Sequence, residues 1–269
     1  MATDTKVAIA GAGGRMGRTL VELIQSQTNI VLCGGFDHPD SPVIGNDLGV
    51  IAGTAELGIP IVSNIAALND DYDVLIDFTL PESTLANVAF CRAAHKRMVI
   101  GTTGLAERRS ASDDAGADIA IVFAPNMSVG VNLCFKLTEL AAAALGDDFD
   151  VEIIEAHHRN KVDAPSGTAV RLGEILADTL DRDLATDAVY GREGHTGVRQ
   201  RKTIGFETIR AGDIVGDHTV LFGGAGERIE ITHRASSRMT FASGALRAAA
   251  WVAGRNTGTY DMQDVLNLR

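Results

Sequence analysis

Short apolar runs and helical patterns alternate through the first half of the chain. The apolar runs predict buried strands of a parallel sheet, which carry hydrophobic residues on both faces. These runs lie at residues 7–10, 30–36, 73–79, 98–100 and 119–123. Apolar residues at helical spacing predict helices after residue 17 and over residues 81–94. Strands alternating with helices indicate a doubly wound parallel sheet, so we predict a Rossmann-like α/β domain over residues 1–128.

The pattern changes after residue 128, and a second domain is predicted over residues 129–239. Its predicted elements are helices at 129–145 and 168–180 and strands at 151–157, 199–210, 214–222 and 227–233. Gly212-Asp213 and residues 223–226 separate the last three strands and are typical of hairpin turns. Runs of strands with few helices between them predict an α+β domain on an open mixed sheet. A last helix is predicted over residues 240–254.

Composition and charge narrow the class of protein. The chain has 269 residues, of which 45% are hydrophobic and 22% charged, as in globular proteins. Its formal net charge of −11 argues against nucleic acid as a partner, because phosphate binding needs a basic face. No apolar run is predicted to span a membrane, and residues 1–6 lack the features of a signal segment. Cys33, Cys91 and Cys134 are far apart, so we predict buried thiols, no disulfide and a cytoplasmic protein.

A glycine-rich turn follows the first predicted strand. Glycines at positions 11, 14 and 17 form a variant of GxGxxG in which Met16 takes the usual place of the third glycine. Such a turn lets the backbone approach a pyrophosphate at the start of the next helix. Asp37 ends the second strand, where a carboxylate binds the adenosine ribose hydroxyls. The alternative is a glycine-rich turn that binds no nucleotide. The predicted cofactor-binding residues here are Gly11, Ala12, Gly13, Gly14, Arg15, Met16 and Asp37.

Ionisable side chains are concentrated between residues 152 and 169. Those closest together are His157, His158, Arg159, Lys161 and Asp163. The following turn starts a predicted helix, with Ser166 as N-cap and Gly167 allowing a ligand to come close. Backbone N–H groups at such a helix start bind anions. Proton donors beside an anion-binding turn are what proton-coupled chemistry on an acidic small molecule requires.

Other interpretations of this segment are weaker. A metal site at Glu155, His157 and His158 is disfavoured, because adjacent residues on a strand point to opposite faces and no fourth ligand is suitably spaced. We therefore predict no metal. Ser166 is not predicted to be a nucleophile, because no glycine elbow surrounds it. A solvated charged loop is the remaining alternative. Four further histidines are interpreted as surface or core residues, namely His38, His195, His218 and His233.

The string from Glu152 to Ala169, Glu-Ile-Ile-Glu-Ala-His-His-Arg-Asn-Lys-Val-Asp-Ala-Pro-Ser-Gly-Thr-Ala, resembles the signature of the 4-hydroxy-tetrahydrodipicolinate (dihydrodipicolinate) reductase family. The resemblance implies NAD(P)H-dependent reduction of 4-hydroxy-tetrahydrodipicolinate to tetrahydrodipicolinate, with loss of water, in diaminopimelate and lysine biosynthesis. By the same resemblance, His157 is a proton donor or acceptor and Lys161 a proton donor. The residues that would bind the carboxylates of the substrate are His158, Gly167, Thr168 and Arg238.

The resemblance also implies cofactor contacts at two later strand ends. On spacing alone, residues 101–104 are equally well an ordinary turn, but the matching turns of the family contact the cofactor. The residues assigned in this way are Gly101, Thr102, Thr103, Ala124, Pro125, Asn126 and Met127. In the family, the sheet of the second domain builds a homotetramer, and the C-terminal segment packs back on the nucleotide domain, as residues 240–269 would here.

The chain departs from the family at the cofactor end. Some members place an arginine after the ribose-binding acid and another after the Asp-Phe-Thr strand, where this chain has His38 and Leu80. A carboxylate repels a 2′-phosphate, so we predict that NADH is preferred and NADPH is still usable. Rival functions are another two-domain nicotinamide-dependent reductase and a non-catalytic nucleotide sensor. The sensor is disfavoured because His157 and Lys161 are both present.

Overall fold

The computed structural model describes residues 4–68, 71–105 and 109–269 and consists of two compact units. Unit 1 comprises Met1–Val129 and Arg238–Arg269, and unit 2 comprises Gly130–Ser237. Residues 1–3, which belong to the segment predicted to carry no signal sequence, lie outside the described residues.

Unit 1 is built on a six-stranded parallel sheet with the strand order β11-β5-β4-β3-β1-β2. The strands are β1 (Thr5–Ala10), β2 (Ile30–Phe36), β3 (Val74–Asp77), β4 (Arg97–Ile100), β5 (Ala120–Phe123) and β11 (Gly258–Tyr260). Every residue of β3 and of β5 is buried, as expected for strands covered on both faces.

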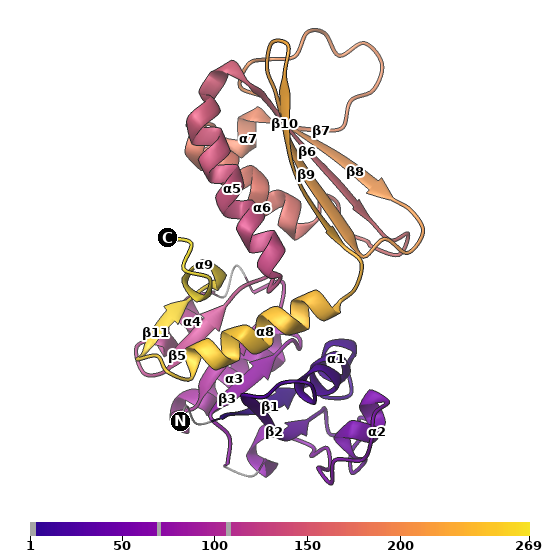
Figure 1. The fold of residues 1–269 in the computed structure, drawn as a ribbon, viewed down its shortest axis with the longest axis vertical. Helices are drawn as coiled ribbons and strands as arrows, with labels where there is room; N and C mark the ends of the chain where they lie inside the picture. The colour runs from indigo at the N-terminus through magenta and orange to yellow at the C-terminus, as the bar shows by residue number, and fades with distance from the viewer. Residues whose placement is uncertain (1–3, 69–70, 106–108) are drawn as a thin grey trace. The chain divides into compact units, whose positions relative to one another are not determined.

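Two helical layers cover this sheet, as Figure 1 shows. The helices are α1 (Arg15–Ile24), α2 (Leu48–Ala52), α3 (Pro81–Ala93), α4 (Arg109–Gly116), α8 (Met239–Val252) and α9 (Met262–Val265), with a 3-10 turn at Ile65–Ala67. On one face, Val7 and Ile9 of β1 belong to the same core as α1 and α8. On the other face, Ala8 and Ala10 share a core with α3 and α4. This alternation confirms the predicted doubly wound class.

Unit 2 is built on a five-stranded mixed sheet with the order β10-β9-β6-β8-β7. Its strands are β6 (Asp150–His157), β7 (Ala188–Tyr190), β8 (Ile204–Arg210), β9 (Gly216–Gly223) and β10 (Arg228–Ala235). Its helices are α5 (Val129–Leu145), α6 (Gly167–Leu180) and α7 (Leu184–Asp187), with a 3-10 turn at Gly146–Asp148. Val151 and Ile153 of β6 share a core with Leu172 and Leu176 of α6. Figure 1 shows α5 and α6 along one face of this sheet, and the predicted α+β class is confirmed.

The strand connections differ from the prediction at one place. The glycine turn at residues 223–226 does join a hairpin, because β9 and β10 pair antiparallel. Gly212-Asp213 does not, because β6 lies between β8 and β9 and pairs parallel with β8 and antiparallel with β9. The predicted strand at 199–210 begins only at Ile204. Arg199 instead binds Asp150 and the Val151 carbonyl, which holds that segment across the start of β6.

Helix α5 is an exception to the prediction that no apolar run is long enough to span a membrane. With the turn after it, Val129–Asp148 is long and apolar enough to cross a membrane, with a mean hydropathy of 1.3. A core helix meets the same criterion, and α5 packs Phe135 and Ala142 into the core of unit 2. Its other side exposes Leu133, Leu137 and Leu140.

The cysteine prediction was correct on bonding and partly wrong on burial. All three thiols are free, but only Cys91 is buried, whereas Cys33 and Cys134 are half-buried. Burial raises the pKa of Cys91 to about 12, so this thiol stays protonated.

Candidate active site

The glycine turn of unit 1 leads from β1 into α1 and is tightly packed. Gly11 has a φ of +65°, in the left-handed region that favours glycine. An added Cβ at Gly17 would lie 2.4 Å from the Gly11 carbonyl oxygen, so only glycine lets α1 approach the turn. Gly17 thus supplies the close helix packing that the usual motif assigns to its third glycine, one position after Met16.

Asp37 follows β2, and its carboxylate lies beside this turn. Its Oδ2 accepts a hydrogen bond from the Gly13 N–H at 2.8 Å, and its Oδ1 accepts one from the His38 N–H at 2.7 Å. Arg18 donates from Nε to the Gly13 carbonyl oxygen at 2.8 Å. Gly13 therefore contacts both the Asp37 carboxylate and the Arg18 guanidinium.

The turn after β1 meets the turn after β3 at the edge of the sheet where ligands bind. β1 lies between β2 and β3, so its carboxyl end is the topological switch point. An added Cβ at Gly11 would lie 2.9 Å from the Thr79 methyl group. The buried Asp77 accepts bonds from the Thr79 hydroxyl at 2.6 Å and from Asn87 Nδ2 at 2.8 Å. The Thr102 hydroxyl lies 3.5 Å from Asp77 Oδ1, which ties in the turn after β4.

The other cofactor candidates differ in exposure. Thr103 and Pro125 are exposed, and Asn126 is half-buried with its Oδ1 accepting the Ser128 N–H at 2.9 Å. Gly101 lies against the Phe78 ring, which an added Cβ would meet at 2.1 Å. The candidates whose side chains are buried, and which therefore present mainly backbone atoms, are Thr102, Ala124 and Met127.

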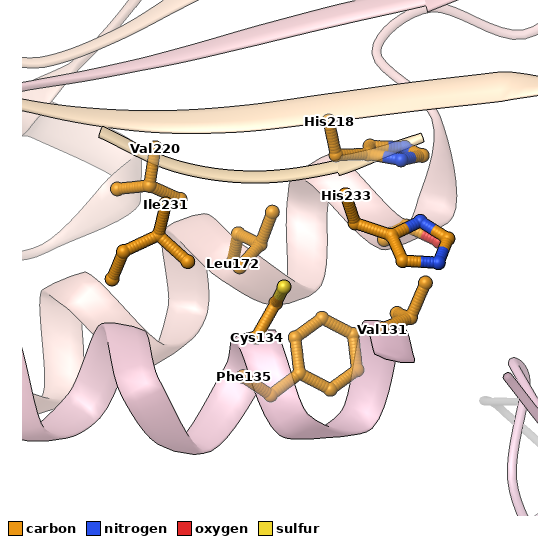
Figure 2. Close-up of a pocket in the computed structure, with 9 residues that line it drawn as sticks. Val131, Cys134, Phe135, Leu172, His218, Val220, Ile231 and His233 are labelled. Atoms are coloured by element: carbon orange, nitrogen blue, oxygen red, sulfur yellow. The ribbon is translucent and has the colours of Figure 1, made fainter. Parts of the chain in front are cut away.

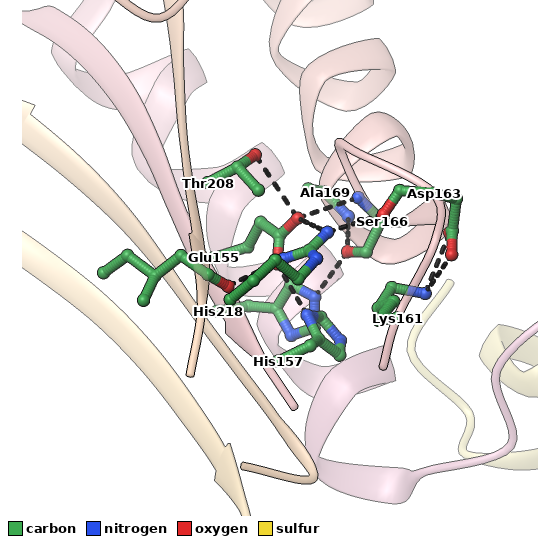
Figure 3. A network of polar contacts seen from close by, with 10 residues as sticks. Glu155, His157, Lys161, Asp163, Ser166, Ala169, Thr208 and His218 are labelled. Atoms are coloured by element: carbon green, nitrogen blue, oxygen red, sulfur yellow. Dashed lines mark hydrogen bonds and ion pairs between the residues drawn. The ribbon is translucent and has the colours of Figure 1, made fainter. Parts of the chain in front are cut away.

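The second cluster lies in unit 2, where β6 ends at His157. His157 Nδ1 is 2.5 Å from Glu155 Oε2, and both residues are buried (Figure 3). Burial lowers the pKa of His157 below its ordinary value, although the contact with Glu155 opposes this. Burial raises the pKa of Glu155, but bonds from Arg210 and His157 outweigh it, so the pKa lies below its ordinary value. At neutral pH, His157 is therefore neutral and Glu155 is charged.

Ser166 caps α6, as predicted. Its Oγ accepts a hydrogen bond from the Ala169 N–H at 3.3 Å and lies 2.9 Å from His218 Nε2. Gly167 is the first residue of the helix and is exposed, and Thr168 beside it is half-buried. The first turn of α6 thus lies beside the His157 cluster.

Lys161 lies in the loop between β6 and α6. Its Nζ is 2.8 Å from both carboxylate oxygens of Asp163 (Figure 3). Burial raises the pKa of Asp163, but the bond from Lys161 outweighs it and the pKa is lowered. His158 is half-buried at the end of β6. Arg238 is exposed at the N-cap of α8 in unit 1, whereas Lys161 and His158 belong to unit 2.

Two functional neighbours were missed from the sequence. Arg210, at the end of β8, binds Glu155, and His218, on β9, binds Ser166. His218 was interpreted as a surface or core residue. It is buried, as the second of these has it, and it lies opposite Glu155 in the sheet register. That register depends on β6 lying between β8 and β9, which the sequence did not reveal. Burial lowers the pKa of His218 to about 3, so this residue is neutral.

A small pocket borders the cluster (Figure 2). His218 and His233 line it at one end. Its remaining lining residues come from α5, α6 and the sheet and are Val131, Cys134, Phe135, Thr168, Leu172, Val220 and Ile231. Among the described residues, no group of three or more His, Cys, Asp or Glu side chains is arranged to hold a metal ion.

Two family models together match nearly the whole chain. The model described as "Dihydrodipicolinate reductase, N-terminus" matches residues 5–127, and "Dihydrodipicolinate reductase, C-terminus" matches residues 130–266. A curated relative from Pseudomonas fluorescens strain Pf-5, named 4-hydroxy-tetrahydrodipicolinate reductase, is 59% identical over 266 residues. That match covers 98% of this chain and 99% of the relative. The relative from strain Pf0-1, with the same name, is 58% identical over 265 residues, again 98% of this chain and 99% of the relative.

A solved structure is similar along its full length. The dipicolinate-bound dihydrodipicolinate reductase from Paenisporosarcina sp. TG-14 has a TM-score of 0.72 and 25% sequence identity. The comparison covers 97% of this chain and 99% of that chain.

Proposed function

Because the chain belongs to the dihydrodipicolinate reductase family, we propose that it reduces 4-hydroxy-tetrahydrodipicolinate to tetrahydrodipicolinate, with loss of water, in diaminopimelate and lysine biosynthesis. The reductant is a reduced nicotinamide cofactor. The observation that carries the proposal is the cluster at the start of α6, where a Glu155-bound His157 stands beside a capped helix start. This arrangement joins a group that exchanges protons with a group that binds anions.

The residues of unit 1 fit a dinucleotide. The pyrophosphate would lie at the start of α1, where Gly11, Gly13 and Gly14 carry no side chain that would keep it away from the backbone. Asp37 would bind the ribose hydroxyls. The turns at residues 101–103 and 124–127 would flank the nicotinamide, which supplies the hydride when bound.

The net reaction consumes one proton besides the hydride, so a proton donor must stand beside the substrate. Lys161 is the donor in this proposal, because it carries an ammonium group and Asp163 holds it in place at 2.8 Å. His157 exchanges a proton through Nε2, because Glu155 occupies its Nδ1. The leaving hydroxyl group also needs a proton to depart as water, and the neighbouring ring carbon loses a proton as the double bond forms, so the net count stays at one. The second proton-transferring group serves this elimination.

The substrate carries two carboxylates, and the proposal assigns a separate set of groups to each. The N–H groups of Gly167 and Thr168, at the positive end of the α6 dipole, would bind one of them together with His158. Arg238 would bind the other with its planar guanidinium.

For the cofactor, we propose that NADH is preferred and NADPH is used less well. The Asp37 carboxylate next to the Gly13 N–H favours ribose hydroxyls over a 2′-phosphate. His38 is exposed and Leu80 brings no charge. Arg18, bonded to Gly13, is the cation that keeps NADPH usable.

We also propose a cytoplasmic homotetramer. The three free thiols suit a reducing compartment. The face of the unit 2 sheet opposite to α5 and α6 carries the half-buried Ile154 and Leu221 and the exposed Ile209. Sedimentation in solution checks the assembly, for which we expect about four times the chain mass of 28.3 kDa.

The activity is tested by incubating the purified chain with 4-hydroxy-tetrahydrodipicolinate and NADH and following the loss of NADH absorbance. We expect oxidation that depends on the substrate and tetrahydrodipicolinate as product. Omitting the substrate is the control. A folded protein that oxidises no NADH would refute the proposal.

A further inference from the structure

One buried carboxylate connects the parts of the unit 2 cluster. Glu155, 1% exposed, accepts two hydrogen bonds from Arg210, Nη1 to Oε2 and Nη2 to Oε1, both at 2.8 Å. Its Oε2 is 2.5 Å from His157 Nδ1. Its Oε1 accepts the Ser166 N–H at 3.1 Å and lies 3.4 Å from the Thr208 hydroxyl (Figure 3). Both oxygens are thus fully used, and the orientation of the carboxylate is fixed.

Fold stability alone does not require this ion pair. Burying two charges costs several kcal/mol of desolvation, which their attraction only partly offsets, and apolar replacements are often as stable. The pair binds two elements with a role in the proposed function, His157 and the first turn of α6. The contacts therefore indicate a role beyond stability.

We propose that Glu155, oriented by Arg210, is a positioning residue for the reaction, an inference that rests on the proposed function. A carboxylate only accepts hydrogen bonds, so the proton between the two groups belongs to His157 Nδ1. Nε2 is then the atom that gains and loses a proton, as in other histidines oriented by a carboxylate. Gly216 leaves room on that side, because an added Cβ there would lie 3.1 Å from Nε2.

The same carboxylate fixes where the anion-binding turn stands relative to His157. Ser166 donates its N–H to Glu155, and its hydroxyl lies 2.9 Å from His218. The rings of His157 and His218 meet edge to face with their centres 5.1 Å apart. Moving Glu155 would therefore displace both the proton-exchanging ring and the helix start.

The charges around His157 give the substitution a distinct pH signature. Glu155 of β6 raises the pKa of His157, whereas burial, Lys161 of the following loop and Arg210 of β8 lower it. The remaining titratable neighbour is His218 of β9, which is neutral because burial lowers its pKa to about 3. Glu155→Gln removes the one charge that favours protonation, so the His157 limb of the kcat/KM profile should move to lower pH.

The test compares Glu155→Gln with a double variant, Glu155→Leu with Arg210→Met, which removes both charges of the ion pair together. We expect each to lower kcat about 10–100-fold while KM for NADH stays within about twofold, as for other carboxylates that orient a histidine. Glu174→Gln is the matched control. It breaks an exposed pair with Arg171 on α6 and should leave kcat unchanged.

A second measurement does not depend on turnover. Nitrogen NMR of histidine-labelled protein, with the His157 signal assigned from its loss in His157→Gln, should place the neutral-state proton on Nδ1. In Glu155→Gln this preference should be lost. A wild-type proton on Nε2, or a folded double variant with kcat within twofold of wild type, would overturn the inference. Absence of turnover in wild type would instead refute the proposed function.

Discussion

Gly167→Ala separates what the fold needs at the start of α6 from what the substrate needs. Gly167 is the first residue of the helix, it is exposed, and its φ is not in the left-handed region. Apart from its two chain neighbours and the adjacent backbone of its own helix, no atom among the described residues lies within 4 Å of the position that an added Cβ would take. Alanine should therefore fit without strain and reduce the entropy of the unfolded chain. We expect a gain in unfolding free energy of up to about 1 kcal/mol, or a rise in Tm of about 1–4 °C.

The effect on the substrate should be opposite in sign. If the N–H groups of Gly167 and Thr168 hold a carboxylate, the added methyl group stands where the substrate comes close to the backbone. A tenfold rise in KM for 4-hydroxy-tetrahydrodipicolinate would correspond to a loss of about 1.4 kcal/mol of binding free energy. We expect a rise of at least this size, with KM for NADH unchanged. Thermal unfolding and steady-state kinetics on one preparation measure both effects.

Gly173→Ala on the same helix is the control, for which we expect the opposite result, a loss of stability without a change in KM. There an added Cβ would lie 2.5 Å from the Phe206 ring in the core, so overpacking should cost about 1–3 kcal/mol without changing KM. Two results would refute the reasoning for Gly167→Ala. A lower Tm would mean that the fold itself requires glycine, and a higher Tm with unchanged KM would mean that no substrate group approaches this turn.

Four further outcomes are expected. Lys161→Ala should lower kcat about 10²–10⁴-fold, because a proton donor is lost, while NADH affinity measured by calorimetry stays unchanged. Dicarboxylate analogues such as dipicolinate should inhibit competitively against the substrate, and Arg238→Ala should weaken their binding. Equal calorimetric affinities in both proteins would exclude Arg238 as a ligand. Specificity constants should favour NADH over NADPH at pH 8, because the Asp37 carboxylate repels a 2′-phosphate. His218 has a pKa lowered to about 3 by burial and takes up a proton on unfolding below pH 6.5. The free energy of unfolding should therefore decrease as the pH is lowered from 6.5 to about 3, by up to about 1.4 kcal/mol per pH unit. In His218→Gln, Tm should depend less on pH.

The class of both units could be predicted because hydrophobic periodicity determines which faces are buried. β3 and β5 are apolar at nearly every position and are buried throughout, and α1 has its buried residues at helical spacing. The order of the strands in unit 2 could not be predicted. Gly212-Asp213 has the composition of a hairpin turn, yet β8 pairs with β6 instead of β9. The residues of a turn do not determine which two strands of a sheet pair with each other.

In the candidate site, too, local features could be predicted and contacts between distant parts of the chain could not. Ser166 could be predicted as an N-cap because the capping bond is local in sequence. Arg210 and His218 could not, because each reaches the cluster from more than fifty positions away, at separations of 55 and 52 residues. Short strands β7 and β11, of three residues each, were missed because such segments are too short for periodicity.

Each unit has a buried carboxylate at or near the end of a central strand. The hydrogen-bond partners of the two carboxylates differ, and the difference follows from what each carboxylate holds in place. Asp77 in unit 1 is bound by the neutral groups of Thr79 and Asn87. Its contacts with Thr79 and Thr102 hold the turns after β3 and β4 together, for which neutral hydrogen bonds suffice. Glu155 in unit 2 contacts His157, which gains and loses a proton in the proposed function. A carboxylate can favour the charged ring only if it stays ionised itself when buried, and this requires a permanent cation. Arg210 supplies that cation, which explains why an arginine is committed to a site where the fold alone would accept apolar side chains.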